Sequence, residues 1–213
     1  MASLGAVFDS VFYPRALRPA ALSLHGAGGW RRPLPAARWF GQPDPEEQQV
    51  LDLALPVALD VGCGPGRHAG TLVRRGVEAV GLDVSPAAVR HARRRGLTVL
   101  HGSVFDRVPG TGTWGSVLLL DGNVGIGGDP GRLLRRVRAL LRPAGRALVE
   151  LDPPGTPAGP DRVRLALEGS TSPPFRWATV GADGIEGLAE VGGFGLAELW
   201  NGNGRWFARL DAR

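Results

Sequence analysis

The sequence predicts an α/β protein with a mostly parallel sheet, and three observations lead to this fold class. From residue 57 onward, short apolar runs alternate with helical patterns, as in chains that pass repeatedly from strand to helix. A glycine-rich turn at 62–66 separates the first apolar run from the first helix. The last two runs flank the turn at 201–204, which predicts a closing hairpin and an antiparallel last strand.

Length and composition favour one sizeable core. The chain has 213 residues, 43% of them hydrophobic, and its single cysteine is Cys63. One cysteine excludes an intramolecular disulfide and a four-cysteine zinc site. No apolar run approaches the roughly 20 residues of a membrane helix, and residues 1–15 lack the basic start of a secretory signal. We therefore expect a cytoplasmic protein, a monomer or homodimer, that does not enter membranes.

The charge balance is basic, and lysine is absent. The 25 residues counted as Lys+Arg are all arginine, and against 20 acids they give a formal net charge of +5. A basic surface can bind nucleic acid. Arginine in place of lysine also accompanies the glycine-, proline- and alanine-rich composition of a GC-rich genome, and the arginines are spread along the chain. We favour this second explanation, and nucleic acid remains the alternative partner.

Residues 1–56 predict a cap or lid over a domain formed by residues 57–213. A short helix is expected from about Leu4 to Tyr13 and another from Glu46 to Leu55. Between them, residues 25–45 are rich in glycine, proline, tryptophan and arginine, which predicts an ordered loop.

The domain is expected to contain five parallel strands with helices between them. The predicted strands are 57–61, 77–82, 97–101, 114–120 and 147–151. Ser85-Pro86 and Asp129-Pro130 each supply an N-cap followed by a proline at the first helical position. Right-handed crossovers then place helices on both faces of the sheet.

Residues 153–181 depart from this alternation and predict a small insertion. Residues 162–167 and 175–180 alternate like strands around a proline-rich turn, which indicates a hairpin over the site. A short helix at 183–191 and the terminal hairpin complete the chain.

Ligands of open parallel sheets bind beyond the carboxyl ends of the strands, and the glycine turn stands there. Gly62, Gly64 and Gly66 let the backbone approach a ligand in front of a helix N-terminus. A dinucleotide fold has glycine where this chain has Arg67. The pattern D-x-G-x-G-x-G from Asp60 therefore favours a ligand without a pyrophosphate.

Asp83 ends the second strand, where a carboxylate can accept hydrogen bonds from two ribose hydroxyls. The segments ALDVGCGPGRHAGTLVRRG, VGLDVS and LLRPAGRALVELD together resemble class I S-adenosylmethionine-dependent methyltransferases. The resemblance covers residues 57–152 well and, through the terminal hairpin, the whole of 57–213. It implies a Rossmann-like three-layer sandwich with a seven-stranded, mostly parallel sheet of order 3-2-1-4-5-7-6. The implied cofactor is S-adenosyl-L-methionine, and the implied product is S-adenosyl-L-homocysteine.

The resemblance also implies a role for individual positions. Asp83 would bind the ribose, and Val84 would pack on the adenine. Many members carry an acid after the third strand, where Ser103 or the nearby Asp106 would serve here. The implied cofactor-binding residues are Asp60, Gly62, Cys63, Gly64, Asp83, Val84, Ser103, Val104 and Asp121.

Methyl transfer from a sulfonium is an in-line displacement, so alignment of the reactants supplies most of the catalysis. A base is needed only if the acceptor must lose a proton. Asp121 and Asn123, in the loop after the fourth strand, are candidates for orienting the acceptor. His25 and Tyr13 are candidate bases if the N-terminal segment folds over the pocket. The spacing of histidines and acids predicts no metal site.

Two residue types bear on the acceptor. Aromatic residues of the N-terminal segment form either an apolar lid or pins that hold the segment to the sheet; they are Phe8, Phe12, Trp30, Trp39 and Phe40. Four arginines are candidates to hold an anionic acceptor by bidentate contacts: Arg31, Arg32, Arg164 and Arg176.

We expect a methyltransferase that acts on a small molecule in bacterial specialised metabolism, because the sequence shows no recognisable RNA-binding appendage. The alternative is an rRNA or tRNA methyltransferase that uses the arginine-rich surface. The run at 121–124 lacks the Asn/Asp-Pro-Pro-aromatic signature of base-amino methylation, which argues against one subclass. A non-enzymatic binding protein is disfavoured by the intact glycine turn and by Asp83.

Overall fold

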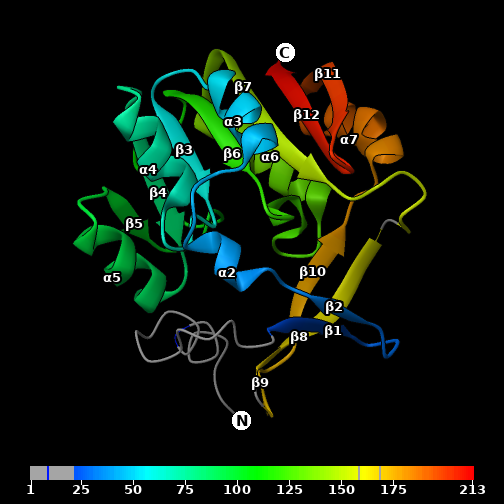
Figure 1. Cartoon of the computed structure of the whole chain (residues 1–213). Coiled ribbons are helices and arrows are strands. Elements are labelled where there is room, and N and C mark those ends of the chain that lie inside the picture. The colour runs from blue at the N-terminus through cyan, green and yellow to red at the C-terminus, as the bar shows by residue number, and fades with distance from the viewer. Residues whose placement is uncertain (1–8, 10–21, 158, 168) are drawn as a thin grey trace.

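The computed structural model describes residue 9 and residues 22–157, 159–167 and 169–213 (Figure 1). The helix expected from Leu4 to Tyr13 lies outside the described residues, except for Asp9. Within them, the chain forms a seven-stranded sheet and a smaller five-stranded sheet. None of the described helices is long and apolar enough to cross a membrane.

The seven-stranded sheet has the predicted strand order. Its strands, from one edge to the other, are β5 (Val99–His101), β4 (Ala79–Asp83), β3 (Ala58–Val61), β6 (Trp114–Leu119), β7 (Leu141–Leu151), β12 (Arg205–Ala212) and β11 (Phe194–Gly202). Pairs from β5 to β7 are parallel, whereas β12 runs antiparallel to β7 and to β11. In chain order this is 3-2-1-4-5-7-6 with an antiparallel last strand, so the prediction is confirmed.

Helices cover both faces of this sheet, as the crossovers predict. On one face, α3 (Pro45–Asp52) and α4 (Arg67–Arg74) bury apolar side chains such as Leu51 and Leu72. On the other, α6 (Pro130–Leu140) and α7 (Ile185–Gly192) bury a separate set that includes Leu133 and Ile185. The helix α5 (Pro86–Arg94) packs against β4 and β5.

The predicted helix start signals are confirmed by side-chain hydrogen bonds. The Ser85 hydroxyl accepts the backbone N–H of Ala88, and the Asp129 carboxylate accepts that of Arg132. At the start of α3, Asp44 and Glu47 form a reciprocal capping box. Each pair satisfies an N–H that a helix start otherwise leaves without a partner.

The smaller sheet joins two segments that are remote in the sequence. Its strands are β1 (Ser23–Gly26), β2 (Arg31–Pro33), β8 (Gly159–Leu167), β9 (Ser170–Thr171) and β10 (Phe175–Thr179). They are antiparallel in the order β10-β8-β1-β2, with β9 also on β8. The hairpin predicted in the insertion is confirmed. The ordered loop predicted for residues 25–45 is wrong at β1, β2 and α2 (Ala36–Trp39). The strands were missed because β2 pairs with β1, and β1 pairs with β8, which lies far along the chain.

We call this five-stranded arrangement the small sheet, and its two faces differ sharply. Side chains of opposed residues share a face of a sheet, and successive side chains alternate. Leu24, Val163 and Leu165 are buried on the inner face, where Phe175 and Trp177 pack with them. Figure 1 shows the small sheet beside one end of the seven-stranded sheet.

Candidate functional site

A cavity of about 460 Å³ lies between the carboxyl ends of β3, β4 and β6 and the small sheet. Its first wall comes from the large sheet and includes Val61, Gly62, Cys63, Gly64, Pro65, Arg67, Leu82, Asp83, Val84, Gly102, Ser103, Val104, Asp121, Gly122 and Asn123. The opposite wall is mainly apolar and includes Leu24, Arg32, Leu34, Trp39, Phe105, Ile126, Asp152, Leu165, Phe175 and Trp177. Both the volume and the mostly apolar lining are typical of small-molecule sites.

The glycine turn after β3 has a backbone that needs glycine. Gly62 has φ +70° and Gly64 has φ +54°, both in the left-handed region. A Cβ at Gly62 would come within 2.6 Å of the side-chain nitrogen of Asn123. That nitrogen, Nδ2, donates to the carbonyl oxygen of Val61 at 2.8 Å and more weakly to that of Gly62. Asn123 therefore holds the turn in shape from the neighbouring loop.

Asp83 ties the glycine turn to the end of β4. One carboxylate oxygen accepts the N–H of Gly64 and the other accepts that of Ser85, each at 2.8 Å. Burial raises the pKa of Asp83 above its usual value, and these two N–H donors oppose the rise. Each oxygen keeps lone-pair capacity for a further donor. The next residue, Val84, lines the cavity and is 53% exposed, which is unusual for a valine.

Of the two residues considered after β5, Ser103 lines the cavity. Its hydroxyl oxygen accepts the N–H of Phe105 at 3.2 Å. Asp106 is not among the lining residues, and its carboxylate accepts the N–H of Ser103 at 3.2 Å. Val104 is buried and also lines the cavity.

Asp121 lies at the end of β6 and is held from two sides. Both carboxylate oxygens accept from Nη2 of Arg67, at 2.7 and 2.8 Å, and its N–H donates to Glu150 at 2.7 Å. Its φ of +57° is rare outside glycine, asparagine and aspartate. Arg67 occupies the position where a dinucleotide-binding fold has a glycine, and it is the partner of Asp121.

An ion-pair network underlies Asp121, and Glu47 is at its centre. Glu47 is fully buried and binds Arg67, which is 2% exposed. Burial alone would raise the pKa of Glu47, but hydrogen bonds from His68 and Arg67 hold it well below its usual value. Arg205 also binds Glu47, together with Glu150. The ion pairs extend to Arg38, Asp44 and Asp121. We call the following residues the Glu47 network: Arg38, Asp44, Glu47, Arg67, Asp121, Glu150 and Arg205.

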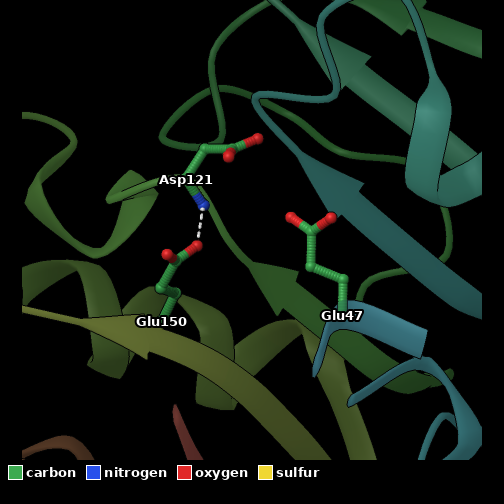
Figure 2. A group of neighbouring side chains, drawn as sticks. All are labelled: Glu47, Asp121 and Glu150. Carbon is green, nitrogen blue, oxygen red and sulfur yellow. Dashed lines mark hydrogen bonds between the residues drawn. The ribbon is translucent and has the colours of Figure 1, made fainter. Parts of the chain in front are cut away.

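Glu47, Asp121 and Glu150 come from three different elements and gather in one place (Figure 2). One ligand atom of each lies within 4.8 Å of the others, a spacing that a metal ion could use. Guanidinium groups already balance these carboxylates, since Arg67 binds Glu47 and Asp121, and Arg205 binds Glu47 and Glu150. We therefore treat this group as an ion-pair network.

Two predicted site residues that the structure describes do not line the cavity, and a third falls outside the described part of the chain. Asp60 is buried and accepts the N–H of Ala69 at 3.2 Å, so it fastens the start of α4 to β3. His25 alternates with the cavity-lining Leu24 along β1, so its side chain lies on the outer face, where it contacts the Ser23 hydroxyl. Tyr13 lies outside the described residues.

Cys63 does line the cavity, and its thiol packs over Gly81. A Cβ on Gly81 would come within 2.6 Å of its sulfur, so the thiol occupies a slot above that glycine. Burial raises the pKa of the thiol well above its usual value, which disfavours a nucleophilic thiolate.

The aromatic residues of the N-terminal segment serve different purposes. Trp39 lines the cavity, as a lid residue would. Trp30 instead donates to Asp161 at 2.8 Å, and Phe40 packs edge-on against His91. Phe8 and Phe12 lie outside the described residues.

Sequence reasoning missed most of the apolar wall and the role of Arg67. Phe175 and Trp177 were expected only as strand residues, and Ile126 only as a loop residue. These three residues line one cavity because β10 packs beside the loop that follows β6. Trp177 of β10 and Ile126 of that loop form a β-bridge there. No local signal in the sequence reports that contact.

A model of the methyltransferase domain family matches residues 58–145, which hold the glycine turn, Asp83 and Asp121. Residues 58–145 thus match the methyltransferase domain family, and the large sheet has the strand order that the resemblance to class I methyltransferases implies. Among curated proteins, the 2-heptyl-1-hydroxyquinolin-4(1H)-one methyltransferase of Mycobacteroides abscessus is 38% identical over 73 residues, which is 32% of each chain. The chain thus spans about a third of the length of that relative.

Solved structures extend the likeness of the methyltransferase domain to nearly the whole chain. A SAM-dependent methyltransferase from Bacteroides fragilis, in complex with S-adenosyl-L-homocysteine, has a TM-score of 0.79 and 23% identity. The alignment covers 98% of this chain and 94% of that one. A 1,6-didemethyltoxoflavin-N1-methyltransferase from Burkholderia thailandensis has a TM-score of 0.54 and 18% identity, over 73% of this chain and 70% of that one. At these identities the likeness shows the fold.

Proposed function

We propose that this chain transfers a methyl group from S-adenosyl-L-methionine to a small-molecule acceptor. The observation that carries the proposal is one cavity with two unlike walls. The glycine turn and Asp83 form the wall expected for the cofactor, and the small sheet supplies an apolar wall opposite. A small acceptor held between them would face the cofactor.

The residues of the first wall fit this cofactor. Gly64 lines the cavity, and no atom lies within 4 Å of where its Cβ would be, so the glycine leaves room for a ligand. The Asp83 carboxylate has capacity for two ribose hydroxyls, and the exposed Val84 offers an apolar surface for a flat base. Ser103 stands on the adenine side as a hydroxyl partner.

The charge under this wall also fits. Four carboxylates of the Glu47 network face three guanidinium groups in the described part of the chain, and His68 also contacts Glu47. When bound, S-adenosyl-L-methionine supplies an electrophilic methyl group on a positively charged sulfur. Two members of this network, Asp121 and Arg67, line the cavity. The negative charge of the Asp121 carboxylate favours a cation on this side of the cavity.

The acceptor wall contributes alignment more than acid–base chemistry. Among its described residues, Asp152 is the only ordinary proton acceptor, and Asp121 lines the cavity on the first wall. We propose that Asp121 and Asn123 position the reactants, Asp121 through its carboxylate and Asn123 through the glycine turn. The proposal does not use His25 as a base, because its side chain lies on the outer face.

The small-molecule acceptor is favoured over RNA for two reasons. The M. abscessus relative bears the name of a small quinolone as its acceptor. By register, Arg31, Arg162 and Arg164 lie on the outer face of the small sheet, so phosphates bound there would not bring a base to the methyl group. We propose bacterial specialised metabolism as the setting, by analogy with such acceptors.

A titration and a labelling assay test the proposal. We expect S-adenosyl-L-homocysteine to bind the wild-type chain and Asp83→Asn to weaken binding about tenfold or more, since hydrogen bonds to a charged group are lost. Asp52→Asn is the control, because Asp52 is an exposed residue that pairs with Arg75 on the surface. Unfolding temperatures of both variants report whether the fold persists.

In the labelling assay, methyl-labelled S-adenosyl-L-methionine is incubated with the protein and a bacterial extract divided into small-molecule, RNA and protein fractions. Label in the small-molecule fraction supports the proposal. Label in RNA contradicts it and supports the rRNA or tRNA alternative. If the wild-type chain does not bind S-adenosyl-L-homocysteine, the assigned cofactor is wrong.

A further inference from the structure

Arg32 is the one arginine of the small sheet whose side chain belongs to the cavity face. It stands opposite Leu24 in the β1–β2 register, and both residues line the cavity. Arg31 and Arg164 both stand opposite His25, on the outer face. Arg176 also lines the cavity, but it alternates with Phe175 and Trp177, so by register its side chain points away from the face that these two rings form.

The guanidinium of Arg32 has donors to spare. Its Nη1 donates to Oδ1 of Asp152 at 2.8 Å. Its Nε and Nη2 make no hydrogen bond with any described residue, and the side chain is 45% exposed whereas that of Asp152 is 12% exposed. A guanidinium fork with two unused N–H directions is suited to a second oxygen anion beside the first.

The surroundings of Arg32 restrict what such an anion is attached to. The same wall is formed by Leu34, Phe175 and Trp177, with Trp39 and Phe105 elsewhere on it. Aromatic walls favour planar rings, which bury large apolar area at low entropic cost.

We propose that the acceptor is a planar, largely apolar ring compound with one anionic oxygen substituent, and that Arg32 binds that substituent. The class includes ring carboxylates and deprotonated acidic ring hydroxyls. This inference rests on the proposed function and names the substrate class of the same cavity. Arg32 is the specificity residue, and Asp152 keeps the guanidinium pointed at the cavity.

The test compares two probes of one shape in the presence of S-adenosyl-L-homocysteine. The probes are 2-naphthoate, a flat ring anion, and 2-naphthamide, its neutral counterpart, and calorimetry gives each Kd. We expect the wild-type chain to prefer 2-naphthoate about tenfold, because the anion gains charge-assisted hydrogen bonds. Arg32→Gln should abolish the preference, and Arg31→Gln, its outward-facing neighbour, should retain it.

Asp152→Asn separates anion binding from a purely structural ion pair. In one case, Arg32 only fastens β2 to the end of β7 through Asp152. Arg32→Gln and Asp152→Asn should then each change the affinities for the two probes by the same factor. If Arg32 binds the anion, Asp152→Asn should keep or increase the preference for 2-naphthoate, since the guanidinium loses its competing partner. Unfolding temperatures show that each variant is folded.

Several results would overturn the inference. These are equal affinity of the wild-type chain for both probes, no binding of either probe, or an unchanged preference in Arg32→Gln. The proposed function fails separately, by absence of S-adenosyl-L-homocysteine binding or of methyl transfer. In that case the same probes are titrated without S-adenosyl-L-homocysteine, and the Arg32 result still decides the ring-anion assignment.

Discussion

At the scale of single residues, Asp121 combines an uncommon backbone conformation with a paired side chain. Its φ of +57° is one that glycine adopts freely and alanine does not. Asp121→Gly and Asp121→Ala both remove the carboxylate bound by Arg67. We expect the glycine variant to be more stable than the alanine variant by about 1 kcal/mol, the reverse of the usual order. Chemical denaturation of the two variants measures this difference, and a more stable alanine variant would contradict it.

Glu47 is the residue whose charge state contributes most clearly to stability. Its pKa lies well below the usual value of about 4.3 because hydrogen bonds from His68 and Arg67 outweigh the effect of burial. The unfolded chain therefore takes up a proton at a higher pH than the folded chain does. The stabilisation is complete above about pH 5 and decreases as the pH falls through the unfolded-state pKa toward the lower folded-state one.

Glu47→Gln should therefore cost about 3 kcal/mol at neutral pH, because it leaves the buried Arg67 short of a charge partner. The cost should shrink between pH 5 and pH 3. Denaturation midpoints at a series of pH values measure it. Glu46→Gln is the control on the same helix and should change stability by less than about 0.5 kcal/mol at every pH. A penalty for Glu47→Gln that does not depend on pH would exclude the charge as its cause.

At the scale of elements, the glycine turn after β3 depends on the 3-10 helix η1 (Asn123–Gly125) that follows β6. Asn123→Ala removes the donor to the carbonyl oxygens of Val61 and Gly62. We expect faster amide exchange across residues 61–66 and weaker S-adenosyl-L-homocysteine binding, by about fivefold to tenfold. Asn201→Ala, in the terminal hairpin, should change neither. Unaltered exchange at 61–66 in Asn123→Ala would show that the turn keeps its shape unaided.

Elements were predictable where their signals are local. The N-caps Ser85 and Asp129 act on N–H groups three residues onward, so sequence alone locates α5 and α6. Strands of the large sheet are short apolar runs that remain recognisable whatever their neighbours are. β1 and β2 have no such pattern, because both are short, β1 has Leu24 as its one buried residue, and β2 consists of the exposed residues Arg31, Arg32 and Pro33.

At the scale of the whole molecule, the small sheet and the large sheet have separate cores. Val163→Asp puts a carboxylate into the buried inner face of the small sheet, at an expected cost of about 3 kcal/mol or more. We expect faster amide exchange in β1, β8 and β10, loss of 2-naphthoate binding, and retained binding of S-adenosyl-L-homocysteine. Ala166→Asp is the control on the outer face of the same strand. Loss of S-adenosyl-L-homocysteine binding in Val163→Asp would show that the two sheets unfold together.

The sequence by itself determined the order of strands and helices, the glycine turn and the position of Asp83. These depend on residues within one element or at the ends of neighbouring parallel strands. Only the tertiary structure decided that Arg32 pairs with Asp152 at the cavity, because these two residues are 120 positions apart in the sequence. The same holds for Arg67 and Asp121, which are 54 positions apart and come together only when α4 and the end of β6 pack side by side. Local patterns specify elements, whereas contacts between remote side chains follow from packing, and packing is where the acceptor half of this site arises.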